Sequence, residues 1–273
     1  MLGKLIRYEF KATKKFMLLA YALLFVMSVI LGIGSRIDFD IFMGNSVLAE
    51  IGGLIGGILM LGFVLAYVAV NCAVFAGMFF FAINRFRHNI LGNEGYLMHT
   101  LPVRPRDHVI AKTAVSTVWT FCSFIVATLS YMTLFFIAYG NEISSAFSEI
   151  SSEAILSGTD FSGGYRYMAE SVIVVVVSVV AGYLQIYASM AMGYSNNTNR
   201  ALLSIAVYIG INISWSIVEA ILTLPLSGVS QARLFSGDGV HMMLLVSFLS
   251  ALLKSVACYY IATFFLTKKL NLQ

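Results

Sequence analysis

Charged residues are scarce in this chain. Asp, Glu, Lys and Arg make up 11% of its 273 residues, whereas they make up roughly a quarter of an ordinary soluble domain. Hydrophobic residues make up 59%, which is more than a water-soluble core absorbs. The composition therefore excludes an ordinary soluble protein. It predicts an all-α integral membrane protein, because a helix pairs its backbone amides internally within the hydrocarbon layer.

Residues that could form disulfide bonds or metal sites are also few. The three cysteines all fall inside apolar stretches: Cys72, Cys122 and Cys258. A thiol in lipid behaves as a small hydrophobe, so these residues predict neither a disulfide framework nor a metal site. His88, His99 and His108 share one loop, but no two of them are four residues apart and no clustered carboxylates or thiols accompany them. We expect no bound metal.

Motifs of autonomous catalysis are missing. The chain has no Gly-x-x-x-x-Gly-Lys-Ser/Thr phosphate loop, so it cannot hydrolyse ATP in that manner by itself. It also lacks a Gly-x-Ser-x-Gly elbow, a His-Glu-x-x-His helix and paired intramembrane aspartates. We therefore predict no catalytic residue, no cofactor bound by this chain, and no enzyme activity without a partner.

Six apolar runs are long enough to span a bilayer as helices, which takes about 20 residues. They lie near residues 16–34, 51–83, 113–139, 171–194, 201–222 and 241–266. The second run exceeds the bilayer thickness, so it must tilt or extend into the cytoplasm. The first run has no clear small-x-small cleavage site behind it, and we expect it to remain in the mature protein. With no internal repeat or long linker, residues 1–273 are expected to form a single domain.

Basic residues near the ends of spans resist translocation and so indicate the orientation of the chain. With the N-terminus in the cytoplasm, every Lys and Arg outside the spans lies inside except Arg36, Arg166 and Arg233. Both termini are then cytoplasmic. The net charge of +4 follows from this distribution, so it does not predict nucleic-acid binding. The acidic external stretch 140–170 has apolar residues at helical spacing and predicts a short helix after the third span.

Residues 1–15 have the pattern of an amphipathic helix. One side carries apolar residues and the other carries basic residues, namely Leu2, Leu5, Ile6, Phe10 and Phe16 against Lys4, Arg7, Lys11, Lys14 and Lys15. Such a helix lies along a membrane surface, with its basic side toward water and lipid headgroups. We predict an interfacial helix here, followed by a turn into the first span.

Glu9 interrupts the apolar side of this helix. A carboxylate at such a position is costly to bury unless a cation pairs with it. Two interpretations are open. Either a Lys or Arg from another cytoplasmic segment contacts Glu9, or Glu9 sits at the rim of the helix and reaches water.

The cytoplasmic loop between the second and third spans, residues 84–112, contains a second short amphipathic pattern. Leu91, Met98 and Leu101 can share one face of a helix that Pro102 ends. A loop that exposes apolar side chains without a core of its own is a candidate docking surface for another protein. The alternative is a solvated loop whose Leu and Tyr residues pack onto the end of the second helix.

Two segments resemble a known family. The stretch Gly92-Asn-Glu-Gly-Tyr-Leu-Met-His-Thr-Leu-Pro-Val103, with Lys112 ahead of the third span, resembles the coupling-helix region of bacterial ATP-binding-cassette (ABC) permeases of the six-helix exporter class, the ABC-2 type. The stretch Leu5-Ile-Arg-Tyr-Glu-Phe-Lys11 is similar to the interfacial elbow helix of the same family. In this chain that helix would contain Arg7, Glu9, Phe10 and Lys11.

The resemblance implies a permease subunit that exports an unidentified substrate, such as a peptide, a lipid or a drug, with energy from a separate ATPase. The ATPase would bind ATP and Mg²⁺. It would contact the loop through Glu94, Gly95, Tyr96, Leu97, Leu101 and Pro102. A second permease, identical or homologous, would complete the translocation path in the bacterial cytoplasmic membrane.

Two charged residues interrupt the apolar spans. Lys254 lies near the middle of the sixth span, and Glu219 lies toward the outer end of the fifth. Intramembrane charges usually face a bundle interior or a watery cavity, and they often mark a transport path. If the two helices adjoin, either the residues form an ion pair or Lys254 lines the substrate route. Their depths in the membrane match poorly.

Four glycines, Gly52, Gly53, Gly56 and Gly57, form two overlapping Gly-x-x-x-Gly steps at the start of the second span. Small residues let helices approach closely. The steps predict a contact with a neighbouring span or with the second permease, and the alternative is flexibility at a helix end.

Two other functions are compatible with these patterns. An ion-coupled secondary transporter would use Lys254 and Glu219 as coupling charges and would need no partner ATPase. A non-transporting membrane module, such as a sensor or an immunity factor, would bind a ligand on its external face without flux.

Overall fold

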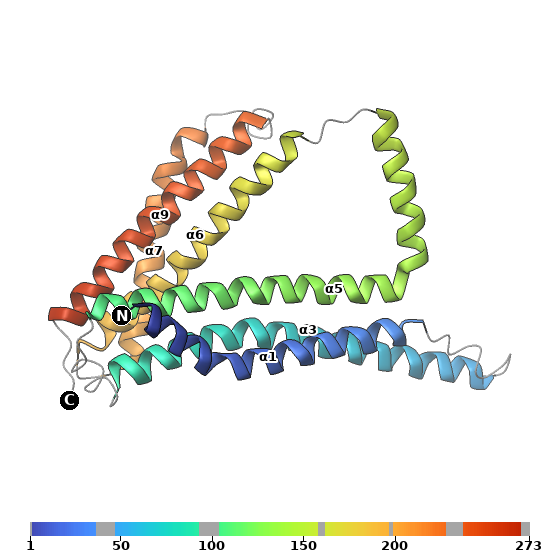
Figure 1. The fold of residues 1–273 in the computed structure, drawn as a ribbon, viewed down its shortest axis with the longest axis horizontal. Coiled ribbons are helices and arrows are strands. Elements are labelled where there is room, and N and C mark those ends of the chain that lie inside the picture. The colour runs from blue at the N-terminus through green and yellow to red at the C-terminus, as the bar shows by residue number, and fades with distance from the viewer. Residues whose placement is uncertain are drawn as a thin grey trace. The chain divides into compact units, whose positions relative to one another are not determined.

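The computed structural model describes residues 2–36, 47–92, 104–157, 162–196, 199–227 and 237–268. Within these ranges the secondary structure is helical and contains no strand (Figure 1). The elements are α1 (Leu2–Gly34), α3 (Val47–Phe86), the π-helix η1 (Arg87–Leu91), α5 (Pro105–Ser157), α6 (Ser162–Gly193), α7 (Arg200–Ser227) and α9 (Gly237–Lys268). The predicted all-α fold is confirmed for the described part of the chain.

Six of the described helices are long and apolar enough to cross a membrane, as the apolar runs predict. The longest apolar run belongs to α3, which has 40 residues. At a rise of 1.5 Å per residue, such a helix is about 60 Å long, roughly twice the thickness of the hydrocarbon layer. This length agrees with a helix that tilts or extends beyond the bilayer.

The first helix differs from the prediction in one respect. α1 runs without interruption from Leu2 to Gly34, so the predicted turn between residues 1–15 and the first span is wrong. No glycine or proline occurs between Lys4 and Leu31, and nothing in this stretch therefore ends a helix. An amphipathic pattern indicates which side of a helix faces water, but it does not create a bend. The location of the segment at a membrane surface stays a prediction.

α5 contains a kink at Tyr139, where φ is −128° and ψ is 23°. The part before the kink covers the predicted third span, and the part after it ends at Ser157. Gly140 follows the kink directly, and glycine weakens a helix because fixing its backbone costs more entropy. The short helix predicted after the third span is therefore present.

The chain divides into two compact units, and α1, α3 and α5 contribute to both. The first, called the cavity unit below, comprises Met1–Phe10, Phe80–Val118 and Asp160–Gln273. The second, the three-helix unit, comprises Lys11–Phe79 and Trp119–Thr159. The start of the chain and both flanks of the predicted docking loop thus belong to the same unit as α6, α7 and α9.

Hydroxyl groups join the helices of the three-helix unit. Tyr21 OH and Ser123 Oγ lie 2.7 Å apart between α1 and α5. Tyr67 OH and Ser130 Oγ lie 2.8 Å apart between α3 and α5. All four side chains are buried. Pairing buried hydroxyls removes the cost of leaving them unsatisfied in apolar surroundings.

α1 and α5 approach closely at Gly32. A Cβ at this position would lie 2.8 Å from the Cβ of Ile137, closer than real side chains approach. We expect Gly32→Ala to force the helices apart, at a cost of about 1–3 kcal/mol, and to lower the Tm of the purified protein in detergent. Gly57→Ala is the matched control, because a Cβ there meets nothing within 4 Å. Equal Tm values for the two variants would contradict the close contact.

The predicted Gly-x-x-x-Gly steps have different surroundings within α3. Gly56 is buried and borders an apolar cavity together with Ile30 and Leu31 of α1. Gly53 is half-buried, and Gly57 is exposed. The surroundings of Gly52 lie outside the described part of the structure. Gly56 therefore faces a neighbouring span, and a contact with a second permease stays a prediction.

The core of the cavity unit combines aromatic and small residues. α6 supplies Tyr187, Ala188 and Ala191, and α9 supplies Cys258 and Ala262. All five are 2% accessible or less. Alanine at the contact lets the backbones of α6 and α9 come close, which favours packing within a membrane.

Candidate functional site: a buried ion cluster and a polar cavity

Glu9 lies on the buried side of α1. Thr13 and Met17 follow it at helical spacing and are also buried, whereas Tyr8 and Lys11 are exposed. The buried face of the helix thus extends to its N-terminal end, because side chains four residues apart share a face. Only 7% of Glu9 is accessible, so its carboxylate needs a partner.

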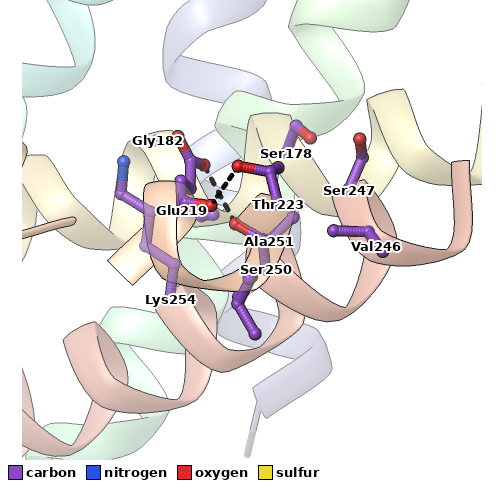
Figure 2. Close-up of a pocket in the computed structure, with 11 residues that line it drawn as sticks. Ser178, Gly182, Glu219, Thr223, Val246, Ser247, Ser250, Ala251 and Lys254 are labelled. Atoms are coloured by element: carbon purple, nitrogen blue, oxygen red, sulfur yellow. Dashed lines mark hydrogen bonds between the residues drawn. The ribbon is translucent and has the colours of Figure 1, made fainter. Parts of the chain in front are cut away.

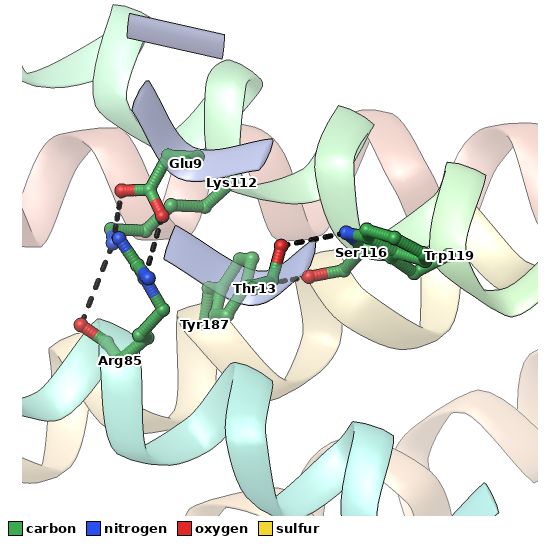
Figure 3. A network of polar contacts seen from close by, with 7 residues as sticks. All are labelled: Glu9, Thr13, Arg85, Lys112, Ser116, Trp119 and Tyr187. Atoms are coloured by element: carbon green, nitrogen blue, oxygen red, sulfur yellow. Dashed lines mark hydrogen bonds and ion pairs between the residues drawn. The ribbon is translucent and has the colours of Figure 1, made fainter. Parts of the chain in front are cut away.

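Two cations from distant segments contact the Glu9 carboxylate (Figure 3). Lys112 Nζ donates a hydrogen bond to Oε1 over 2.8 Å, and Arg85 Nε lies 2.7 Å from Oε2. Lys112 Nζ also donates to the carbonyl oxygen of Arg85 over 3.5 Å. The side chain of Lys112 is 3% accessible, so water screens the cluster little. A cation therefore pairs with Glu9, and the alternative in which Glu9 reaches water does not apply.

Arg85 and Lys112 flank the loop that is predicted to dock another protein. Arg85 belongs to the last turn of α3, and Lys112 lies near the start of α5. The three residues, called the ion cluster below, therefore fasten both stems of the loop to α1. The residues predicted to contact an ATPase lie outside the described part of the structure: Glu94, Gly95, Tyr96, Leu97, Leu101 and Pro102.

The stem before the loop ends in a π-helix. η1 places Ile90 and Leu91 in the core of the cavity unit, with 3% and 5% of their surfaces accessible. Leu91 therefore does not contribute to an exposed docking face, contrary to the prediction. A helical wheel drawn with 3.6 residues per turn assumes an α-helix. The wider turn of a π-helix points the side chains in other directions than such a wheel predicts. π-Helical turns are rare in proteins overall, but those that do occur are often located at functional sites.

Both stems also contact α6. The Phe86 ring stacks on the Tyr187 ring, with the centroids 4.3 Å apart and the planes inclined by 9°. Ser116 Oγ of α5 and Tyr187 OH lie 3.2 Å apart and share a hydrogen bond (Figure 3). Tyr187 is thus held by one residue from α3 and one from α5.

Sequence patterns identify Glu9 but not its partners. Lys112 is 103 residues from Glu9, and Tyr187 is 71 residues from Ser116. Local periodicity contains no information about pairs at such separations. The usable signal is the charge of Glu9 on an apolar face, which requires a cation from another segment of the chain.

The cavity unit contains a cavity of about 360 Å³ between α6, α7 and α9, called the polar cavity below (Figure 2). Several of the residues that line it are small or carry a hydroxyl group: Ser178, Gly182, Thr223, Ser247 and Ser250. Glu219 of α7 and Lys254 of α9 line it as well. The fold therefore brings the two intramembrane charges of the sequence to one site.

Within the described chain, Glu219 and Lys254 do not form an ion pair. Glu219 Oε1 accepts a hydrogen bond from Ser250 Oγ over 2.9 Å instead. Ser250 precedes Lys254 by one turn of α9, so it lies closer to the N-terminal end of this helix, which begins at Gly237. The poor match in depth between Lys254 and Glu219 that the sequence indicates is consistent with the absence of a direct contact, and Ser250 reaches the carboxylate instead.

Trp215 orients Ser250. Its indole Nε1 donates a hydrogen bond to Ser250 Oγ over 3.2 Å, and Ser250 donates in turn to Glu219. Ser250 is 4% accessible, whereas Trp215 is half-buried and Glu219 is exposed, so the relay starts from a buried hydroxyl on α9. The carboxylate of Glu219 is therefore held at a defined position on the cavity wall. Neither Trp215 nor Ser250 stands out in the sequence, because a single Ser or Trp in a span has no distinctive pattern.

A separate polar contact, outside the polar cavity, joins α6 and α9. His241 Nδ1 and Glu170 Oε2 lie 2.6 Å apart, and the Tyr167 ring lies beside the imidazole with the centroids 4.5 Å apart. Glu170 and His241 border another cavity of about 500 Å³, whose other residues are apolar, including Ile173 and Phe248. Sequence reasoning missed this pair, because its members are 71 residues apart.

No family model matches the chain, and neither does any curated protein or solved structure. The ion cluster and the polar cavity both belong to the cavity unit.

Proposed function

We propose that this chain is the membrane-spanning subunit of an ATP-driven exporter. It works with a second permease subunit and with cytoplasmic ATPase subunits that bind ATP and Mg²⁺. It is located in the bacterial cytoplasmic membrane, with both termini in the cytoplasm. The observation that carries this proposal is the connection of both stems of the predicted docking loop to the helices of the polar cavity within one compact unit.

That connection supplies a mechanical path from the loop to the polar cavity. A partner that pushes on residues 93–103 moves the ends of α3 and α5, where Phe86 and Ser116 hold Tyr187. Tyr187 and the cavity residue Gly182 lie on the same helix, little more than one turn apart. Because a helix is stiff over this distance, a shift of Tyr187 changes the wall of the cavity.

The ion cluster makes the two stems move together. Glu9 contacts Arg85 in the stem before the loop and Lys112 in the stem after it. A buried charge is costly to separate from its partner, so the stems resist moving apart. Force on the loop is therefore passed to α1 and α6 instead of being absorbed by bending of one stem.

The energy for such a movement has to come from another protein. The chain lacks a phosphate loop, so it has no site of that kind for ATP. The resemblance of residues 92–103 to a coupling-helix region supports an ATPase as that protein. The substrate then binds in the membrane part of the complex.

Co-purification with a cassette-type ATPase encoded by a neighbouring gene tests the proposal. We expect Leu97→Asp and Leu101→Asp each to reduce the amount of bound ATPase at least about tenfold, because a charge is costly in an apolar docking groove. His99→Asp is the matched control, since it adds the same charge to the opposite face of the predicted helix and should retain the ATPase. Full retention of the ATPase by all three variants would remove the docking assignment.

One alternative is favoured by the polar cavity itself. Glu219 and Lys254 line the cavity without forming an ion pair, as coupling charges of an ion-driven transporter would. That function requires proton- or sodium-dependent flux in proteoliposomes that contain this chain alone. The exporter requires the ATPase and ATP in the same assay.

A further inference from the structure

The polar cavity presents two opposite charges that are available to a ligand. Lys254 makes no hydrogen bond or ion pair with any residue that the structure describes. Glu219 uses Oε1 to accept the bond from Ser250, and no described donor bonds to its second oxygen. An unpaired ammonium in the middle of a membrane span is costly, so a bound anion would stabilise Lys254.

The carboxylate is positioned before any ligand arrives. The relay from Trp215 through Ser250 holds Glu219 on α7 over distances of 3.2 and 2.9 Å. Lys254 extends from α9 on the wall of the same cavity (Figure 2). Because Ser250 binds Oε1 of Glu219 and Lys254 forms no ion pair with it, the cavity wall presents a positive and a negative group that are not paired with each other.

The remaining wall has room and hydrogen-bonding groups. Ser178 and Ser247 add hydroxyls from α6 and α9, and Gly182 leaves open space, since a Cβ there would meet nothing within 4 Å. The cavity volume of about 360 Å³ lies at the lower end of the range of small-molecule sites, roughly 300–1,000 Å³. The cavity therefore suits a small group of atoms rather than a large apolar molecule.

We propose that the polar cavity binds a zwitterionic group, with a ligand ammonium at Glu219 and a ligand phosphate or carboxylate at Lys254. A ligand with a single charge would leave the other wall charge without a charged partner within a membrane span, which is costly. Such a group occurs both in a phospholipid headgroup and at the termini of a short peptide. The identification of this ligand as the exported substrate rests on the proposed function, whereas its binding does not.

Ligand-dependent thermal stabilisation tests the proposal on the full chain, purified in a non-ionic detergent without any ATPase. The zwitterionic probes are dihexanoyl phosphatidylethanolamine and trileucine, and the single-charge probes are dihexanoyl phosphatidylglycerol and hexylamine. We expect at least one zwitterion to raise the Tm with an apparent affinity about tenfold or more above that of either single-charge probe. The lipid and peptide arms identify the source of the group. If neither zwitterion exceeds the single-charge probes, the proposal is overturned.

Variants of the wall give a second, independent readout. Glu219→Gln and Lys254→Met should each weaken the zwitterion about tenfold or more, because each removes one charged contact. The controls are Asp107→Asn and Lys268→Met, which remove one charge of each sign outside the cavity and should leave the affinity unchanged. Unchanged affinity in both wall variants would overturn the proposal.

A steric variant covers the case in which the charge variants do not fold. Gly182→Phe fills the cavity from a position with no neighbour within 4 Å, and it should abolish zwitterion binding while the protein stays monodisperse. Normal binding by this variant would place the ligand elsewhere and overturn the proposal. These binding assays contain no ATPase, so their result does not depend on whether the ATPase co-purifies. A failure to bind the zwitterion likewise does not argue against ATPase docking.

Discussion

Replacing Glu9 with Gln is expected to lower the free energy of unfolding by about 3–5 kcal/mol. Gln keeps the shape of the side chain but removes its charge, which leaves Lys112 and Arg85 close together without an anion. With the Lys112 side chain 3% accessible, water cannot replace the lost carboxylate. Unfolding by a denaturing detergent, followed by far-ultraviolet circular dichroism, measures the difference.

The controls for Glu9→Gln lie on the same helix. Arg7 and Lys11 are exposed on α1, so Arg7→Gln and Lys11→Gln should change the free energy of unfolding by no more than about 0.5 kcal/mol. Replacing Glu9, Arg85 and Lys112 together by Met should recover most of the loss, because an apolar set of similar volume leaves no buried charge unpaired. If Glu9→Gln unfolds like Arg7→Gln, the ion cluster does not hold the stems of the loop.

The features that were predictable from sequence are local. An apolar run of about 20 residues is sufficient to predict a spanning helix, because the backbone must pair within the segment. The helix after the third span is likewise local, since its apolar residues recur at helical spacing within the stretch 140–170. The end of the first segment was not predictable from amphipathicity alone, because amphipathicity indicates which side of a helix faces water and not where the helix ends.

The features that were not predictable are contacts between segments. Lys254 and Glu219 were identified as a set because charges are rare in spans, and they do line one cavity. Their poor match in depth already argued against a direct pair, but the sequence did not indicate that Ser250, one helical turn before Lys254 on α9, would bind the carboxylate. Leu91 shows the same limit, since a π-helix at the end of α3 redirects its side chain into the core.

Tyr187→Ala is expected to break the mechanical path from the loop to the polar cavity. The substitution removes a ring that is 1% accessible and that stacks on Phe86, so it should also cost about 3–5 kcal/mol of stability. A bimane probe on Ser178→Cys, in a background with the native cysteines replaced by Ala, reports changes in the cavity. We expect ATP to change its fluorescence in the complex with the ATPase, and Tyr187→Ala to abolish that change.

Two further variants separate coupling from stability. Tyr183→Ala removes a ring of the same size and burial from α6 and a stacking neighbour of Tyr187, but it leaves the contacts of Tyr187 with Phe86 and Ser116 in place, so it should lose similar stability but keep the ATP-dependent signal. Tyr187→Phe keeps the stack on Phe86 and loses only the bond to Ser116, worth about 1 kcal/mol, and should retain a reduced signal. A full ATP-dependent signal in Tyr187→Ala would show that force reaches the cavity without passing through Tyr187, because neither the stack nor the hydrogen bond exists in that variant.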